Sequence, residues 1–424
     1  MLVAGNGSAV IEVENARRAL RRPRIRRSLQ GILPRAGCIA LALGVAEAAS
    51  AIAVHELKVY RGIRYRTIRA LLGDEQREQI QSFIDQSHLW YQKHDPELGW
   101  INAPGGSYVG CTQNGQGVRS KHTYSREPPT GSVRIAAFGD SFVHGDEVGD
   151  DEVWSSVAES SRPGLEVMNF GVSGYGVDQA YLRYMRDGRS FSPHIVVIGF
   201  FPDDLYRDVS VFRPFLAPGT GHQMTKPRFM LRDGQLVLFP NPLPRVEDYR
   251  RLLENPEAIL LPLRPFDAFF PEGYAAGPFD FLRSVRLLKL AREQALQLRK
   301  PRLLNGEGFN PASEAFQTTV AVFDAFHRAV VEDRAKPLIV FFPSEQEVEG
   351  YRAGIPPSYE PLKEVFRQRS YDFEDALTPF QATAAHLAPQ SLFVRVHYSG
   401  LGNAIVARHL LERLANRGWL SMCR

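Results

Sequence analysis

The stretch RIAAFGDSFVHGDEV, residues 134–148, decides how the chain is interpreted. Its first residues form a short apolar run that is typical of a buried strand, and Gly-Asp-Ser follows directly. Ser141 is then expected at the end of a strand, either as the N-cap of a helix or as an exposed nucleophile. A nucleophile needs a turn that lifts its hydroxyl above the sheet and backbone N–H groups that bind a developing oxyanion. The tripeptide by itself favours neither role.

Further apolar runs alternate with helical patterns along the rest of the chain. The runs are VRIAAFG (133–139), LEVMNFG (165–171), HIVVIGFF (194–201), KPLIVFFP (336–343) and LFVRVH (392–397), and a helix is predicted over 399–416 at the end. Because the runs are continuously apolar, they predict strands that are buried on both faces. Parallel strands separated by helices indicate a doubly wound α/β domain.

The alternation of strands and helices breaks between about residues 209 and 335. Within this segment, KPRFMLRDGQLVLFP (226–240) predicts a hairpin that turns at Asp233 and Gly234. A proline-rich stretch and a long helix follow, so we interpret the segment as an insertion or lid. In an open parallel sheet, ligands bind beyond the carboxyl ends of the strands, and the insertion is expected near that edge.

The amino-terminal part combines a basic arm with an apolar segment. Seven arginines lie between residues 17 and 27, and 19 mostly apolar residues follow from Ala36 to Val54, about the length that crosses a bilayer. Glu47 opposes membrane insertion, and a buried alanine-rich helix is the alternative. The predicted segments are a basic arm (1–35), a membrane-spanning or signal-anchor helix (36–56), a linker helix (57–93) and a main domain (94–424).

Composition, net charge and motifs argue against a disordered, a phosphate-binding, a nucleic-acid-binding and a metal-binding protein. With 44% hydrophobic and 23% charged residues, the chain is that of a globular protein, and its formal net charge is only +4. The sequence shows no phosphate-binding loop and no nucleic-acid patch beyond the arginine-rich arm. Cys38, Cys111 and Cys423 lack metal-ligand spacing, so no metal and no cofactor is expected. Cys111 and Cys423 either form a disulfide or remain thiols.

His397 is the candidate proton acceptor for Ser141. It ends an apolar run and precedes a helical pattern, so it is expected at the same edge of the sheet as Ser141. An imidazole in hydrogen-bond reach of a serine hydroxyl acts as a general base. The two residues together favour the nucleophile over the N-cap for Ser141.

Four blocks of sequence together resemble the SGNH, or GDSL-type, serine hydrolases. The blocks are AFGDSFVHG (137–145), NFGVSGYG (169–176), FPDDL (201–205) and VHYSGLGNAIVARHLL (396–411). The resemblance covers about residues 94–420 and leaves the insertion unmatched. It implies a flavodoxin-like three-layer α/β/α sandwich that cleaves acyl esters, often of carbohydrates or lipids, without a metal.

The resemblance also implies roles for the matching positions. Ser141 matches the nucleophile, His397 the general base, and the N–H groups of Ser141 and Gly174 two donors of the oxyanion hole. The third donor in the family is an asparagine, but Asp203 stands at the matching position. An ionised carboxylate repels an oxyanion, so Asp203 is expected to be protonated, turned away or compensated by a cation.

A second departure stands beside the histidine. The family places an aspartate two or three residues before it, where this chain has Arg395 and Val394. Asp372 and Asp375 are the nearest upstream aspartates, but their pattern favours a solvated turn. We therefore predict a Ser-His dyad whose imidazole is oriented by a backbone carbonyl or by a distant acid.

Further polar residues near the predicted nucleophile are candidates for supporting or substrate-binding positions. They are Asp140, His144, Asn169 and Asp204. Asp140 can fix the turn before Ser141 by accepting backbone N–H groups. His144, together with Asp146, either contacts substrate or has an ordinary role at the start of a helix.

Three functions fit these residues. The first is a membrane-anchored esterase for small-molecule or glycan esters, and the second is an O-acyltransferase that passes an acyl group to a glycan hydroxyl. The third is a glycan- or acyl-binding module without catalysis, since Asp203 and Arg395 depart from the family. The anchor predicts a membrane partner and an extracytoplasmic, periplasmic main domain, with a cytoplasmic domain as the alternative.

Overall fold

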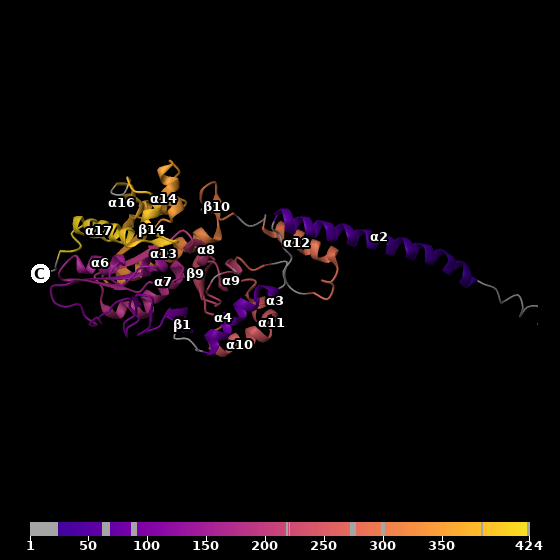
Figure 1. Cartoon of the computed structure of the whole chain (residues 1–424), viewed down its shortest axis with the longest axis horizontal. Coiled ribbons are helices and arrows are strands. Elements are labelled where there is room, and N and C mark those ends of the chain that lie inside the picture. Colours follow the sequence, from indigo (N-terminus) through magenta and orange to yellow (C-terminus); the bar gives the residue numbers. More distant parts are fainter. Residues whose placement is uncertain are drawn as a thin grey trace, which may run out of the picture. The chain divides into compact units, whose positions relative to one another are not determined.

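The computed structural model describes most of the chain. The chain forms two compact units, each with most of its contacts between its own residues. The described residues are 24–61, 68–85, 91–217, 219, 221–271, 277–297, 302–382 and 385–421. The smaller unit comprises Met1–Tyr65 and Gly277–Arg292, and the larger unit comprises Arg66–Ala276 and Glu293–Arg424. Figure 1 shows the elements of both.

A five-stranded sheet forms the centre of the larger unit, and its strands are all parallel. In spatial order the strands are β13 (Phe373–Asp375), β12 (Lys336–Phe341), β7 (Ile195–Phe200), β5 (Val133–Phe138) and β6 (Leu165–Asn169). Counted along the chain, this is the flavodoxin-like order 2-1-3-4-5. In the register of the sheet, Ala136 of β5 lies opposite Met168 of β6 and Val196 of β7.

Helices cover both faces of this sheet, because successive side chains of a strand point to opposite sides. In β5, Ala136 and Phe138 pack into one core, while Ile135 and Ala137 pack into the other. The first core includes residues of α7 (Val177–Arg183), α13 (Glu314–Glu332) and α15 (Glu360–Gln368); the second includes residues of α6 (Trp154–Ser160), α14 (Glu345–Arg352), α16 (Leu377–Ala382) and α17 (Gly400–Asn416). The chain is therefore a three-layer α/β/α sandwich, and the predicted fold class is confirmed.

The predicted sheet strand over residues 392–397 is wrong. This stretch forms β14 (Phe393–Val394) and β15 (His397–Tyr398), a short antiparallel hairpin outside the central sheet. The chain reverses at Arg395, whose φ of 55° lies in the left-handed region and interrupts the extended backbone. The fifth strand is β13 instead, which comes from the segment that was expected to be a solvated turn.

The insertion contains the predicted hairpin. Strands β8 (Arg228–Arg232) and β9 (Gln235–Phe239) pair antiparallel. Asp233 and Gly234 both have positive φ, of 52° and 75°, which is the conformation that a two-residue type I′ turn requires. The hairpin prediction is therefore confirmed.

The insertion also shares a separate apolar core with the segment that precedes the main domain. This core contains Ile68, Ile80, Trp100, Tyr249 and Leu252, together with other buried residues. They belong to α3 (Ile68–Leu71), α4 (Asp74–Asp85), β2 (Gly99–Asn102), α10 (Val246–Glu254) and neighbouring elements. The remaining elements of the larger unit are β1 (Gln92–Asp95), β3 (Ser107–Tyr108), β4 (Cys111–Thr112), α5 (Ser141–His144), α8 (Asp204–Arg207), α9 (Arg213–Leu216), α11 (Pro256–Leu260), β10 (Leu304–Asn305), β11 (Gly308–Phe309) and the short helical turns η1 (Tyr184–Gly188), η2 (Arg189–Phe191), η3 (Leu261–Leu263) and η4 (Pro389–Leu392).

The smaller unit contains the long helix α2 (Arg24–Arg61) and the first residues of α12 (Arg283–Gln297). Within α2, the stretch Arg35–Val59 is long and apolar enough to cross a membrane, with a mean hydropathy of 1.9. A membrane anchor and a signal sequence both have this length and composition. The carboxylate of Glu47 accepts hydrogen bonds from the backbone N–H groups of Arg283, at 2.6 Å, and Ser284, at 3.2 Å. Both N–H groups belong to the first turn of α12. The carboxylate of Glu47, which interrupts the apolar stretch of α2, therefore has hydrogen-bond donors.

Two of the three cysteines lie in the described part of the chain. Cys111 is buried and Cys38 is exposed, and both are free thiols. The Cys111 thiol lies 3.6 Å from the carbonyl oxygen of Val148. Cys423 lies outside the described residues, so its pairing with Cys111 stays a prediction.

We expect Gly171→Ala to lower the free energy of unfolding of the larger unit by about a few kcal/mol, which is the usual cost of overpacking a tight site. A Cβ at Gly171 would lie 2.3 Å from the backbone nitrogen of His144, and backbone cannot move aside as a side chain can. The matched control is Gly115→Ala, because a Cβ at Gly115 meets nothing within 4 Å. The midpoint of denaturant unfolding is measured for both variants. Equal midpoints for Gly171→Ala and Gly115→Ala would contradict the prediction.

Candidate active site

Ser141 begins α5 at the carboxyl end of β5. Asp140 is the N-cap of this helix, and its Oδ1 accepts a hydrogen bond from the backbone nitrogen of Phe142 at 2.8 Å. The capping role that was an alternative for Ser141 therefore belongs to Asp140. The Ser141 hydroxyl is left to bond a residue outside the helix.

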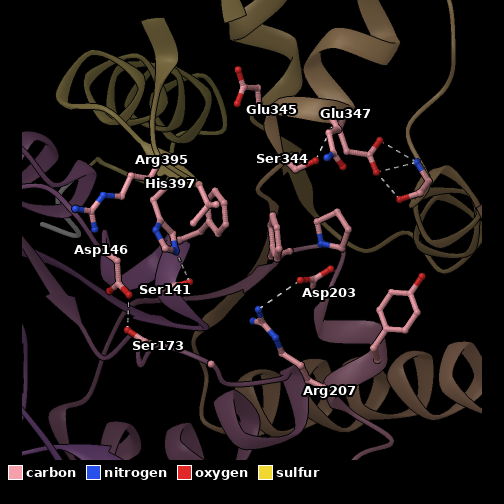
Figure 2. A pocket seen from close by; sticks show the side chains of 18 of the residues that line it. Ser141, Asp146, Ser173, Asp203, Arg207, Ser344, Glu345, Glu347, Arg395 and His397 are labelled. Carbon is pink, nitrogen blue, oxygen red and sulfur yellow. Dashed lines mark hydrogen bonds and ion pairs between the residues drawn. The ribbon is translucent and has the colours of Figure 1, made fainter. Parts of the chain in front are cut away.

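That residue is His397, which the fold brings to Ser141 from the far end of the sequence. The His397 Nε2 lies 2.8 Å from the Ser141 Oγ, and Figure 2 shows the two side chains meeting at the pocket. The imidazole also packs against the ring of Phe142, with ring centroids 5.1 Å apart. This geometry lets a neutral imidazole accept the hydroxyl proton.

An acid also stands beside His397, and sequence reasoning missed it. The His397 Nδ1 lies 3.2 Å from Glu147 Oε2, at ion-pair distance but outside the geometry of a hydrogen bond. Glu147 follows Ser141 by six residues, in the loop after α5. The aspartates considered from the sequence have other partners, since Asp372 pairs with Arg417 and Asp375 with Lys363.

The backbone conformation of Glu147 explains how its side chain reaches the histidine. Its φ is 70°, in the left-handed region that costs a non-glycine residue on the order of 1 kcal/mol. Arg395 also has a left-handed φ, and its Nη1 lies 3.7 Å from Glu147 Oε1. The arginine that stands where the family has an acid therefore faces an acid from another loop. A basic residue at that position was the one signal in the sequence that pointed to an acid elsewhere.

Gly174 lies at the same pocket as Ser141 and His397. Its φ of 81° is left-handed, and a Cβ there would lie 3.0 Å from the imidazole of His222. The N–H of Ser141 belongs to the first turn of α5, where helix N–H groups lack partners within the helix. The two predicted N–H donors are thus placed at one pocket.

A buried chain of hydrogen bonds supports the loop of Gly174. Asp146 accepts the Ser173 hydroxyl at 2.6 Å and lies 2.5 Å from His144 Nδ1, while Tyr91 Oη lies 2.5 Å from His144 Nε2. Burial raises the pKa of Asp146, but the adjoining His144 outweighs this and holds it at about 2. Burial lowers the pKa of His144, so we assign a neutral imidazole that donates to an ionised Asp146. His144 is 1% exposed and is not among the pocket residues, so it supports the site and does not line it.

Arg207 connects the loops that follow three strands of the sheet. Its Nη1 lies 2.8 Å from Asp140, 2.8 Å from Asp204 and 3.0 Å from the carbonyl oxygen of Tyr175. Burial raises the pKa of Asp204, and the charge of Asp140 adds to this rise. Asp140 and Asp204 are therefore buried supports of the loops.

Asp203 lines the pocket and turns toward solvent. Its side chain is 63% exposed, and its Oδ2 lies 3.8 Å from Arg207 Nη2, as Figure 2 shows. The sequence predicted that Asp203 is protonated, turned away from the oxyanion or compensated by a cation. In the structure its carboxylate is turned outward and a cation, Arg207, lies beside it. Asn169 is buried and does not line the pocket; its amide donates to the carbonyl oxygen of Val143 at 2.7 Å.

The pocket around these residues has a volume of about 610 Å³. The insertion contributes Arg213 and His222 to its wall, and aromatic rings of Phe142, Phe201 and Tyr206 line it as well. The His222 Nε2 lies 2.9 Å from Gln92 Oε1. Among the residues that the structure describes, no group of His, Cys, Asp and Glu side chains has an arrangement that could hold a metal ion.

Known proteins were compared with the chain. No family model and no curated protein matches it. Solved structures do match. An acetyl xylan esterase from Geobacillus stearothermophilus is 14% identical, with 70% of this chain and 99% of that chain covered and a TM-score of 0.35. A lipolytic protein of the G-D-S-L family from Veillonella parvula is 11% identical, with 66% and 97% covered and a TM-score of 0.33.

A GDSL-like lipase from Bacteroides thetaiotaomicron is also 11% identical, with 67% of this chain and 88% of that chain covered and a TM-score of 0.29. The last two proteins are described by the same GDSL term as the family that the four sequence blocks resemble. Likenesses this distant carry no conclusion about the reaction.

We expect Glu147→Gln to slow the reaction of Ser141 with a fluorophosphonate by at least about tenfold, because loss of the acid behind the histidine of a Ser-His-Asp triad lowers kcat by about 10⁴-fold. The smaller effect is expected because the contact between Glu147 and His397 lies outside hydrogen-bond geometry. The substitution keeps the shape of the side chain and removes the charge that stabilises the imidazolium. Glu345→Gln is the control, because Glu345 lines the same pocket while the acid that pairs with His397 is Glu147. Equal labelling rates for wild type and Glu147→Gln would contradict the role of Glu147.

Burial lowers the pKa of His222 from 6.5 to about 4. Between these values the unfolded chain binds a proton that the folded chain does not, so the free energy of unfolding falls as the pH drops below 6.5. The shift corresponds to a loss of up to about 3 kcal/mol at pH 4. We expect the free energy of unfolding, measured with denaturant at pH 7 and at pH 4.5, to differ less between the two pH values for His222→Asn than for wild type. The control His386→Asn, at an exposed histidine, should behave as wild type.

Proposed function

We propose that this protein hydrolyses acyl esters, with Ser141 as the nucleophile and His397 as the general base. The observation that carries the proposal is the 2.8 Å contact between Ser141 Oγ and His397 Nε2 in the wall of a pocket. A serine that serves only as a helix cap has no need of an imidazole partner. Here the cap is a different residue, Asp140, and the hydroxyl is directed to the base.

The reaction proceeds in two halves that use the same pair of residues. In the first half, His397 takes the hydroxyl proton while Ser141 Oγ attacks the ester carbonyl, and the imidazolium then returns the proton to the leaving alcohol. In the second half, His397 takes a proton from water, and the resulting hydroxide attacks the acyl-serine. Collapse of the second tetrahedral species releases the carboxylic acid and restores Ser141.

Glu147 stabilises the imidazolium that forms in both halves. Its Oε2 stands 3.2 Å from His397 Nδ1, so an ionised carboxylate interacts favourably with the positive ring. A small rotation of the Glu147 side chain would align this contact as a hydrogen bond, and such contacts commonly tighten when substrate binds. Glu147 thus replaces the aspartate that the family places before the histidine.

The N–H groups of Ser141 and Gly174 receive the negative charge of the tetrahedral species. Loss of one oxyanion donor typically lowers kcat by about 10²- to 10³-fold. Because Asp203 stands where the family has a third donor, we expect slow turnover compared with a site that has all three. Arg207 beside Asp203 reduces the repulsion that this carboxylate exerts.

Hydrolysis is preferred over the two alternatives from the sequence. A binding module without catalysis would not need the contact between Ser141 and His397 or the acid behind it. Transfer to a glycan hydroxyl would use the same residues, and no feature of the pocket wall favours a sugar acceptor over water. We further propose that α2 anchors the protein to a membrane, with the main domain on the extracytoplasmic side.

We expect a fluorophosphonate probe to label the full-length protein in detergent, and both Ser141→Ala and His397→Ala to lose labelling. The serine supplies the reacting oxygen, and the histidine supplies the base that activates it. Ser344→Ala is the control, because Ser344 lines the same pocket but serves as the N-cap of α14. Labelling that survives in Ser141→Ala, or a folded wild type that is never labelled, would refute the proposed function.

A further inference from the structure

Arg213 contributes an unusual side chain to the pocket. It begins α9 in the insertion, it is 8% exposed, and it lines the same pocket as Ser141 and His397. Its Nε and Nη1 are buried and have no hydrogen-bond partner among the described residues. A guanidinium carries five N–H donors, so most of the hydrogen-bonding capacity of this cation is unused.

Other buried arginines of the chain show what is missing at Arg213. Arg207 is equally buried and contacts two carboxylates, while Arg228 contacts Glu314 and backbone carbonyl groups. Arg119 pairs with Asp150 and donates to carbonyl oxygens. Buried charges in proteins are normally paired in this way, because an unpaired buried ion is costly. An arginine that keeps its charge in a pocket wall without a partner is poised for a negative ligand.

The electrostatic surroundings also favour an incoming anion. Burial lowers the pKa of Arg213, and the nearby charge of Arg207 lowers it further. A negative group placed beside Arg213 would relieve both effects. Asp203, Asp204 and Asp140 raise the pKa of Arg213 in turn, but none of them lies within ion-pair distance of its guanidinium. A negative group in direct contact with Arg213 is therefore not supplied by the described residues.

The other charged groups of the pocket do not cancel this site. Asp146 is engaged by His144 and Ser173, and Glu347 by Ser358. Asp203 points to solvent beside Arg207. Glu345 and Arg395 are the remaining charged residues of the wall, and Arg395 is largely exposed near Glu147. Among the charged residues of this wall, Arg213 is therefore the buried cation for which the described residues supply no ion pair.

We propose that Arg213 binds an anionic group of the substrate, a carboxylate or a phosphate, so that the preferred substrates are esters of acidic molecules. The inference rests on the proposed ester hydrolysis at Ser141 and names the class of ester. A guanidinium binds either oxyanion through two parallel N–H donors, which also orients the substrate. The bound anion would remain attached to the rest of the molecule while the ester at Ser141 is cleaved.

The first test compares esters that differ in one charge. The substrates are a monoacetylated methyl hexoside, the corresponding hexuronide with a carboxylate, and the corresponding hexose phosphate. Full-length wild type in detergent should show a kcat/KM at least about tenfold higher for one or both anionic esters, which corresponds to about 1.4 kcal/mol. The two anionic substrates distinguish a carboxylate ligand from a phosphate ligand.

The variant for this test is Arg213→Met, which keeps the length of the side chain and removes the charge. Its kcat/KM should fall at least about tenfold more for the anionic esters than for the neutral ester, so that the preference for anionic esters is lost. Arg232→Met is the matched control, because Arg232 is exposed on β8 of the same insertion. Equal losses on neutral and anionic esters in Arg213→Met would overturn the proposal, since Arg213 would then assist the reaction itself.

A binding measurement separates this inference from the proposed function. In Ser141→Ala, which cannot turn over substrate, hexuronate or inorganic phosphate should raise the Tm more than the neutral hexose does, because a ligand of the folded state stabilises it. The double variant Ser141→Ala, Arg213→Met should lose this difference. Anion binding without any esterase activity would support the site while refuting the reaction. Equal Tm values with anionic and neutral sugars would overturn the site whatever the activity.

Discussion

The guanidinium of Arg207 holds together the loops on which the site depends. It contacts Asp140 after β5, the carbonyl oxygen of Tyr175 after β6, and Asp204 after β7. In a parallel sheet these loops emerge at one edge, but nothing in the sheet itself sets their relative positions. One buried cation shared by two carboxylates and a carbonyl does so. Removing it would leave two buried carboxylates without a cation, a loss of about 3 to 5 kcal/mol.

The two departures from the family are explained by residues that lie close in space but distant in sequence. Arg395 takes the position of the usual acid, and Glu147 supplies a carboxylate to His397 from the loop after α5. Asp203 takes the position of an asparagine, and its charge faces solvent beside Arg207. In each case a change of charge is matched by an opposite charge from another segment. The proposed base, acid and N–H donors would thereby be kept with a different distribution of residues along the chain.

The insertion completes the pocket and gives it a charge of its own. Arg213 and His222 come from this segment and line the pocket together with the loops of the sheet. The insertion and the α3–α4 segment share a core around Trp100 and Tyr249, so this wall has its own apolar support. A segment that the family does not have is thus the place where specificity for a substrate is expected. In the proposed reaction, the loops beside the sheet provide the Ser141–His397 pair, and the insertion provides Arg213 as the cation that binds the substrate.

Sequence alone determined the features that depend on local pattern. Continuous apolar runs predicted the parallel sheet, the Asp-Gly turn predicted the β8–β9 hairpin, and the strand ends singled out Ser141 and His397. It failed where a residue's role depends on contacts between distant segments. The run over 392–397 was read as a sheet strand because the turn at Arg395 leaves the apolar pattern intact, and β13 was missed because Glu374 and Asp375 made a buried strand look polar. Only the tertiary structure decided that Glu147 faces His397, that His144 is a buried support, and that the Nε and Nη1 of Arg213 have no hydrogen-bond partner among the described residues. The reason is that contacts between distant segments are set by the folded positions of side chains.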